Sequence, residues 1–222
     1  MLCLAHRGIH SEHPENSPES FEAARKAGLD GVETDVRASR DGLPLLFHDR
    51  VLADGRPVES LTREELANAV GHRVSSLDEA LALFPDLLWN IEIKTPAALQ
   101  AALPILRRYR HNRWLLVSSF RHELLTECAA AAVADCGLLM GHRPASLQVV
   151  TAARQQWPRL GVLIWNYEAL DETLLRSSEG AGWTHWSWGP ITPEEHARCA
   201  ALQLAGVITD FPERLANGWI QP

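Results

Sequence analysis

The fold is decided by the stretch Gly31–His48, which reads Gly-Val-Glu-Thr-Asp-Val-Arg-Ala-Ser-Arg-Asp-Gly-Leu-Pro-Leu-Leu-Phe-His. Its first part, Gly31–Val36, and its last part, Pro44–His48, are each predicted to be β-strands. Only seven residues separate the two, and these include the turn signal Asp41-Gly42. A parallel neighbour needs a crossover of about a dozen residues or more, so Pro44–His48 must return antiparallel, as the arm of a hairpin.

The other strand-like runs alternate with helix-like segments along the chain. They are Leu2–His6, Leu88–Ile93, Trp114–Ser118, Cys136–Met140, Leu160–Trp165, Trp183–Trp188 and Gly206–Thr209. Such alternation favours βαβ units and a parallel sheet. With Gly31–Val36, and without the hairpin arm, the runs predict an α/β protein with an eight-stranded parallel β/α barrel of the TIM-barrel type. A doubly wound open sheet is the alternative, because periodicity does not distinguish closed sheets from open ones.

Length and composition indicate a single domain over residues 1–222, with a short insertion at about 50–76 after the hairpin arm. The net charge of −7 argues against nucleic acid or an anionic membrane surface as the partner. No apolar run approaches the roughly 18–20 residues that a membrane span requires. The first residues do not resemble a signal peptide, so we expect a cytoplasmic protein. The sequence carries no signal for an oligomeric state.

Two predicted strands carry polar side chains where a barrel strand is normally apolar. Side chains alternate along a strand, so Glu33 and Asp35 share one face, as do Asn90, Glu92 and Lys94. Buried carboxylates are unfavourable unless positive charge lies between them. Together Glu33, Asp35 and Glu92 predict a site for one divalent cation, Mg²⁺ or Ca²⁺ rather than zinc. Salt bridges to basic neighbours, with no metal, are the alternative.

Two histidines lie at strand ends beside these carboxylates. His6 ends the first strand, at the carboxyl edge where barrel active sites are built, and His48 ends the hairpin arm. Two imidazoles that flank a metal can divide general-acid and general-base work near neutral pH. Arg7 and Lys94 add positive charge suited to the oxygens of a phosphate. We therefore predict catalytic roles for the two histidines and phosphate binding by the two cations.

Several motifs of the sequence are those of a known family. They are His6-Arg7-Gly8, Pro14-Glu15-Asn16-Ser17, Gly28–Val36, Asp41–Asp49, Asn90–Lys94, Ser118-Ser119-Phe120 and Gly206–Pro212. In these motifs the chain resembles the glycerophosphodiester phosphodiesterase family. Residues 4–49 form a long compound signature, whereas residues 121–182 match only in pattern.

The resemblance implies a β/α barrel that cleaves glycerophosphodiesters to glycerol 3-phosphate and an alcohol. It also implies a divalent cation at the three carboxylates, acid–base catalysis at the two histidines, and phosphate contacts at Arg7 and Lys94. In the usual mechanism of the family, the glycerol 2-hydroxyl attacks phosphorus and gives a cyclic phosphate, which water then opens. The implied substrate is a small molecule.

One segment departs from the family pattern. A Trp-Thr-Val-Asn-like segment is usual near the last strands, and here the matching stretch reads Trp186-Ser187-Trp188-Gly189. The tryptophan of the family's segment lines the glycerol side of the pocket, and the resemblance implies the same role for Trp186. Two alternatives stay open from the sequence: a lysophospholipase D, which needs an apolar groove for an acyl chain, and a non-catalytic barrel that binds phosphorylated ligands.

Overall fold

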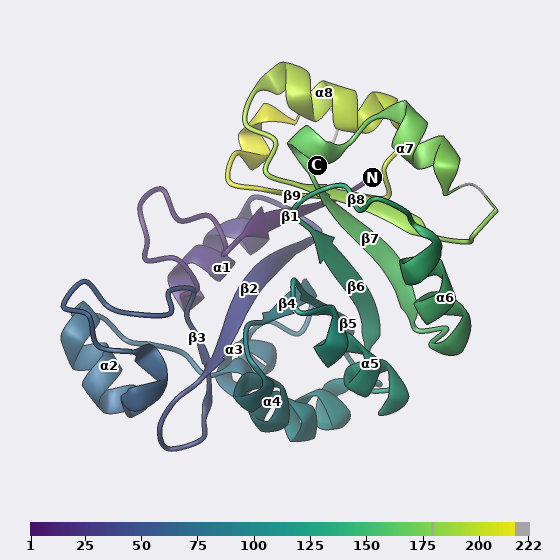
Figure 1. Ribbon diagram of the computed structural model, residues 1–222. Helices are drawn as coiled ribbons and strands as arrows, with labels where there is room; N and C mark the ends of the chain where they lie inside the picture. The colour runs from purple at the N-terminus through teal and green to yellow at the C-terminus, as the bar shows by residue number, and fades with distance from the viewer. Residues whose placement is uncertain (179, 216–222) are drawn as a thin grey trace.

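Eight parallel strands close into a ring in the computed structural model, which describes residues 1–178 and 180–215 (Figure 1). The strands of the ring are β1 (Leu2–His6), β2 (Gly31–Ala38), β4 (Leu88–Ile93), β5 (Trp114–Ser119), β6 (Asp135–Met140), β7 (Leu160–Asn166), β8 (Thr184–Trp188) and β9 (Gly206–Thr209). Because β1 pairs in parallel with both β2 and β9, the sheet has no free edge there and the barrel is closed. The predicted barrel is therefore confirmed, and the open-sheet alternative is wrong.

The hairpin arm is confirmed as well, although it is shorter than predicted. Strand β3 (Pro44–Leu46) pairs antiparallel with β2 and lies outside the ring. Its last ladder contact is the bond from the Phe47 amide to the carbonyl oxygen of Asp35, at 3.0 Å. His48 therefore follows the strand instead of ending it, and its carbonyl oxygen accepts a hydrogen bond from Arg37 Nε at 2.8 Å.

Helices surround the strands on the outside of the barrel (Figure 1). The α-helices are α1 (Pro18–Lys26), α2 (Arg63–Val70), α3 (Leu77–Leu83), α4 (Pro96–Tyr109), α5 (His122–Ala130), α6 (Gln148–Gln156), α7 (Glu172–Ser177) and α8 (Pro193–Ala201). Short 3₁₀ turns are η1 (Val58–Ser60), η2 (Tyr167–Ala169) and η3 (Pro212–Arg214). The stretch 50–76, predicted as an insertion, contributes η1 and α2, which bury a small apolar cluster against Leu45 of β3. Residues 179 and 216–222 of the predicted domain lie outside the described part.

The inside of the barrel changes character from one end to the other. An apolar cluster fills it at the amino-terminal side of the strands, and its buried members are Leu4, Leu88, Leu116, Leu139, Ile164, Trp186 and Ile208. Most of the next inward positions toward the carboxyl ends are polar, for example Asn90 and Ser118. The apolar layer closes the floor of the barrel, so a polar site can form only at the carboxyl edge.

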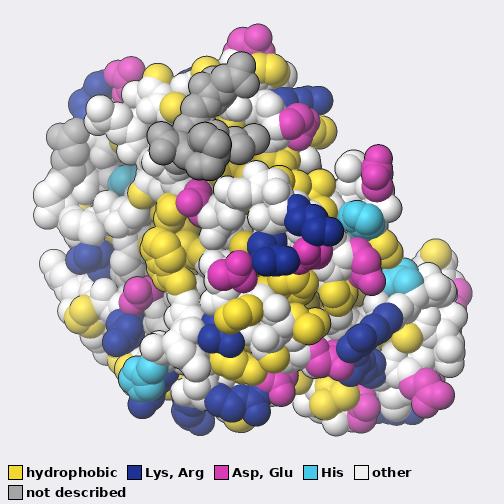
Figure 2. Space-filling view, turned by 180° about the vertical axis from the view of Figure 1, so that it is seen from behind, with side chains coloured by type: hydrophobic (Ala, Val, Ile, Leu, Met, Phe, Trp, Pro, Cys, Tyr) yellow, Lys and Arg dark blue, Asp and Glu magenta, His cyan; other side chains and the backbone are white. Residues whose placement is uncertain are grey.

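The face drawn in Figure 2 carries charges of both signs. Figure 2 shows Lys and Arg side chains interspersed with Asp and Glu side chains over the face that it presents. This arrangement agrees with the net charge of −7 and gives that face no continuous basic surface among the side chains described. No helix within the described ranges has both the length and the apolar character needed to cross a bilayer.

Candidate active site

The three predicted carboxylates meet inside the barrel. Glu33 and Asp35 project from β2, and Glu92 projects from the neighbouring β4, where it pairs in register with Asp35. All three side chains are buried, and one oxygen of each lies within 4.8 Å of the others. The alternation of side chains along two adjacent strands thus produces the acidic cluster that the sequence predicted.

Two cations compensate part of this negative charge. Lys94 Nζ lies 2.7 Å from Asp35 Oδ1 and 2.6 Å from Glu92 Oε1. Arg7 Nε lies 3.2 Å from Asp35 Oδ2. Burial of the Asp35 carboxyl raises its pKa, but Lys94 and Arg7 outweigh burial and hold that pKa below its ordinary value. Asp35 is therefore ionised, and both cations predicted to bind phosphate reach the site.

The negative charge of Glu33 is less well compensated than that of Asp35. Its Oε2 accepts a hydrogen bond from the Arg7 amide at 3.2 Å, and its nearest ionisable partner is His6, whose Nε2 is 3.8 Å away. Burial, together with the charge of Asp35, raises the pKa of Glu33 to about 8. Burial also raises the pKa of Glu92, against the effect of Lys94. The cluster thus holds more carboxylate than its cations neutralise, and its all-oxygen donor set fits a hard divalent cation.

Asn16 holds Asp35 in place, a role that the sequence did not indicate. Its Nδ2 donates to Asp35 Oδ2 at 3.0 Å, while its Oδ1 accepts from the Thr34 hydroxyl at 2.7 Å and from the Asp35 amide at 3.2 Å. The backbone of Asn16 has φ +55°, a left-handed conformation that asparagine adopts more easily than most residues. The neighbouring residue, Ser17, is the N-cap of α1.

His6 is oriented by a carboxylate from the opposite end of the chain. Its Nδ1–H donates to Asp210 Oδ1 at 2.7 Å, while its Nε2 faces Glu33. Burial lowers the pKa of His6, but the hydrogen bond to Asp210 and the charge of Glu33 outweigh it and raise that pKa. Burial raises the pKa of Asp210, yet His6 and His10 hold it at about 2. Sequence reasoning did not assign Asp210 a role, although its place directly after β9 puts it at the same edge as His6.

His48 follows β3, whose last ladder contact is with the carbonyl oxygen of Asp35 on β2. It is close enough to Glu92 that, whenever its ring carries a proton, it favours the ionised form of that carboxyl. Its Nδ1 lies 2.9 Å from Asp49 Oδ1, so this imidazole also has a carboxylate partner. The structure thus brings the two predicted histidines to the acidic cluster, His6 beside Glu33 and His48 beside Glu92.

Trp186, the tryptophan predicted to line the pocket, lies deep inside the barrel. Trp186 is 4% exposed and belongs to the apolar layer at the floor of the barrel. A Cβ on Gly206 would lie 2.5 Å from its ring, so the indole is tightly packed. Two residues further, Trp188 occupies the next inward position, and its ring meets Phe120 edge to face at 5.8 Å. Its buried Nε1 has no hydrogen-bond partner among the described residues.

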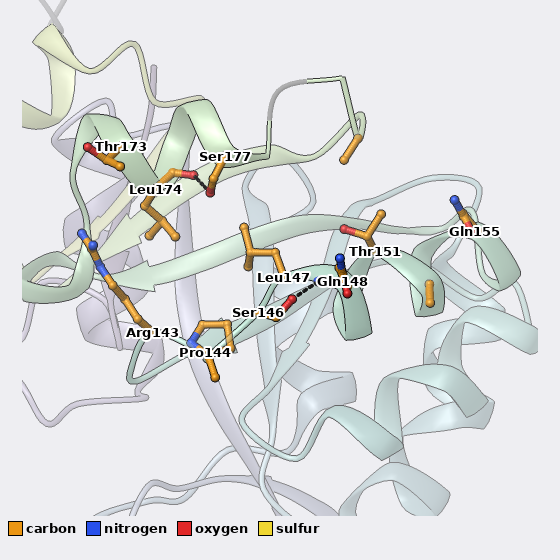
Figure 3. A pocket seen from close by; sticks show the side chains of 13 residues that line it. Arg143, Pro144, Ser146, Leu147, Gln148, Thr151, Gln155, Thr173, Leu174 and Ser177 are labelled. Atoms are coloured by element: carbon orange, nitrogen blue, oxygen red, sulfur yellow. Dashed lines mark hydrogen bonds between the residues drawn. The ribbon is translucent and has the colours of Figure 1, made fainter.

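A separate cleft of about 710 Å³ lies between α6 and α7 (Figure 3). Figure 3 labels Arg143, Leu147, Thr151 and Leu174 among its lining side chains. Arg143 is already paired with Asp171. None of the lining residues belongs to the acidic cluster or to its histidines. The cleft is therefore distinct from the candidate active site.

Fold and site together define a β/α-barrel hydrolase of the kind that acts on phosphate esters. The model of the glycerophosphoryl diester phosphodiesterase family matches residues 6–214, and the chain belongs to this family. The resemblance noted in the sequence is thereby confirmed.

Known proteins similar to this chain carry the same family name. A probable glycerophosphodiester phosphodiesterase 2 of Mycobacterium tuberculosis is 33% identical, with 97% of this chain and 89% of that protein covered. The crystal structure of a glycerophosphodiester phosphodiesterase from Thermotoga maritima is 28% identical, with a TM-score of 0.84 and 96% of each chain covered. An Oleispira antarctica phosphodiesterase, solved with the product sn-glycerol-3-phosphate, has a TM-score of 0.85 at 22% identity, covering 97% of this chain and 95% of that one. The last similarity concerns the fold.

Proposed function

We propose that this protein hydrolyses glycerophosphodiesters to glycerol 3-phosphate and an alcohol, by acid–base catalysis with two histidines and one divalent cation. Membership of the glycerophosphoryl diester phosphodiesterase family makes the chain a phosphoric diester hydrolase. The observation that carries the finer proposal is that His6 and His48 both lie near one acidic cluster, each with its own carboxylate partner. A barrel that only binds phosphorylated ligands has no use for two such groups.

Glu33, Asp35 and Glu92 are the residues that would hold the cation, Mg²⁺ or Ca²⁺. Such an ion supplies positive charge that stabilises the negative charge developing on the phosphoryl oxygens in the transition state. The excess of buried carboxylate over compensating cations supports this assignment, since the folded protein holds Glu33 with a pKa of about 8 when no further cation is present.

Arg7 and Lys94 bind and orient the phosphodiester. Both are fixed by Asp35, so their positive charges are already positioned when the substrate arrives. Lys94 is largely buried and Arg7 mostly so, which strengthens their attraction for an anion relative to surface side chains. Their roles are electrostatic, and neither needs to lose a proton.

The two imidazoles move protons between oxygens. In the first step one imidazole accepts the proton of the glycerol 2-hydroxyl as its oxygen bonds to phosphorus, and the other protonates the departing alkoxide. In the second step water adds to phosphorus, the ring P–O bond to that hydroxyl oxygen breaks, and the two roles reverse. Asp210 fixes the tautomer of His6 with the proton on Nδ1, which leaves Nε2 free to exchange a proton at the site.

Trp188, in place of Trp186, is the residue we propose on the glycerol side. Its indole stands above the apolar floor and packs edge to face against Phe120. Phe120 packs against it and is partly exposed, so together the two rings give the mouth of the barrel one apolar wall.

The purified protein tests the proposal directly. It is incubated with glycerophosphocholine or glycerophosphoethanolamine in the presence of Mg²⁺, Ca²⁺ or EDTA, and glycerol 3-phosphate is measured. We expect release that EDTA abolishes, and a His48→Ala variant with kcat lower by roughly 10²–10⁴-fold. His72→Ala, on an exposed loop, is the matched control. Activity that persists in chelator contradicts the cation, and a loss below tenfold contradicts the role of His48.

A further inference from the structure

A third imidazole joins the pair formed by His6 and Asp210. His10 Nε2 lies 3.0 Å from Asp210 Oδ1, the same oxygen that His6 Nδ1 contacts at 2.7 Å. One ligand-capable atom of each residue lies within 4.8 Å of the other two. The side chains are 29%, 32% and 41% exposed for His6, His10 and Asp210, so an ion can reach them from solvent.

The donor atoms of this group differ in kind from those of the acidic cluster. Glu33, Asp35 and Glu92 offer oxygen only, whereas the second group offers two imidazole nitrogens and one carboxylate oxygen. Nitrogen donors favour Zn²⁺, Co²⁺ or Ni²⁺ over Mg²⁺ and Ca²⁺. Three protein ligands also leave a coordination position for water, as in open zinc sites.

The two segments that carry His6, His10 and Asp210 are each fixed by close contacts with a neighbouring helix. Gly8, at φ +79°, lies so close to α1 that a Cβ would be 2.4 Å from Ser20 Oγ, and the Ile9 amide donates to the Ser20 carbonyl at 2.9 Å. On the other side, buried His196 contacts the Thr209 hydroxyl at 2.8 Å, directly before Asp210. Donors fixed in this way lose little conformational entropy when they bind an ion.

We propose that His6, His10 and Asp210 form a second metal site, selective for Zn²⁺ and similar ions, whose occupation inhibits the enzyme. An ion on His6 Nδ1 forces the proton of the neutral ring onto Nε2, the atom that faces Glu33. His6 then has no free nitrogen with which to accept a proton. The inhibitory effect rests on the catalytic role proposed for His6, but the binding of the ion does not.

Binding is measured without turnover. Equilibrium dialysis against Zn²⁺ in excess Mg²⁺, which keeps the acidic cluster filled, gives the Zn²⁺ bound per chain. His10→Asn removes one ligand while its amide can still donate to Asp210, and we expect at least a tenfold loss of Zn²⁺ affinity. His13→Asn, in the same exposed loop, is the matched control and should bind as the wild type does. Equal Zn²⁺ affinity in the His10 variant overturns the site.

Inhibition is measured on the same variants at fixed Mg²⁺, each relative to its own rate without Zn²⁺. We expect the Zn²⁺ concentration for half-inhibition to rise at least tenfold in His10→Asn and to stay unchanged in His13→Asn. Inhibition of the His10 variant at the wild-type Zn²⁺ concentration means that Zn²⁺ acts at the acidic cluster, and it overturns the inhibitory role. If no variant hydrolyses a glycerophosphodiester, the proposed function fails while the dialysis still decides the metal site.

Discussion

Asp210→Asn tests how His6 is held and tuned. The substitution removes the negative charge that His6 Nδ1 contacts at 2.7 Å, and it keeps the size of the side chain. A hydrogen bond to a charged group contributes about 1.5–3 kcal/mol. Because the Asp210 side chain is 41% exposed, solvent screening weakens this hydrogen bond, and we take the lower end of that energy range, about 1.5 kcal/mol. That energy corresponds to a fall of about one unit in the pKa of His6 and roughly tenfold in kcat/KM.

The direction of the change in pH dependence follows from the wild-type structure. Burial lowers the pKa of His6, and Asp210 with Glu33 more than compensates, so that the folded-state pKa lies above 6.5. Without the charge of Asp210 the effect of burial is less opposed, so the pKa of His6 falls and the ring releases its proton at lower pH. The limb of the pH profile of kcat/KM that reports His6 should therefore move to lower pH.

Two measurements check this expectation. NMR titration of the imidazole ring protons gives the pKa of His6 in both proteins, and the pH profile of glycerophosphocholine hydrolysis gives the kinetic limb. Asp86→Asn serves as the control, because Asp86 is an exposed carboxylate whose ion-pair partner, Arg25, is 3.9 Å away. A His6 pKa within about 0.3 unit of wild type, together with a kcat/KM within twofold, would refute the proposed orientation by Asp210.

Three further predictions concern the cation, the two tryptophans and acid stability. Mg²⁺ at 100 times its Kd should stabilise the wild type by about 2.7 kcal/mol, and Glu33→Gln should remove most of the resulting rise in Tm. Trp188→Ala should raise KM for glycerophosphocholine with little change in Tm, whereas Trp186→Ala should lower stability by about 3–5 kcal/mol; the reverse pattern would return the substrate contact to Trp186. Burial raises the pKa of Glu79, but hydrogen bonds led by Arg63 hold it at about 2, below the ordinary 4.5. Its stabilising effect is therefore present above pH 4.5 and lost as the pH falls toward 2, so denaturant unfolding of Glu79→Gln should converge with wild type at low pH.

The topology could be predicted because chain length restricts how strands connect. Seven residues between two strands exclude a parallel crossover, and that single restriction assigned Pro44–His48 to an antiparallel arm and left eight strands for the ring. The end of the arm was not predictable, because pairing stops at Leu46 through contacts with β2 that no local pattern records. The boundaries of β1, β4 and β9 are the predicted ones, and those of the other five ring strands differ by one or two residues at one end.

The parts of the candidate site that follow from the alternation of side chains along a strand could be predicted. The parts that depend on how deep a residue lies in the barrel, or on a partner distant in the sequence, could not. Glu33 and Asp35 stand out because carboxylates are rare on buried strand faces. Trp186 and Trp188 have the same alternation, so only the barrel reveals that one lies in the floor and the other above it. The partnership of His6 with Asp210 spans 204 positions, and no spacing rule connects residues so far apart.

The seam between β1 and β9 joins the earliest and latest strands of the barrel to emerge from the ribosome. The acidic cluster and its lysine belong to β2, β4 and the residue after β4, so a nascent chain can assemble them long before β9 is synthesised. His6 gains its carboxylate only when the ring closes. A partly synthesised barrel can thus gather the charges that we propose bind phosphate, whereas the His6–Asp210 pair proposed for proton transfer is completed by the final strand.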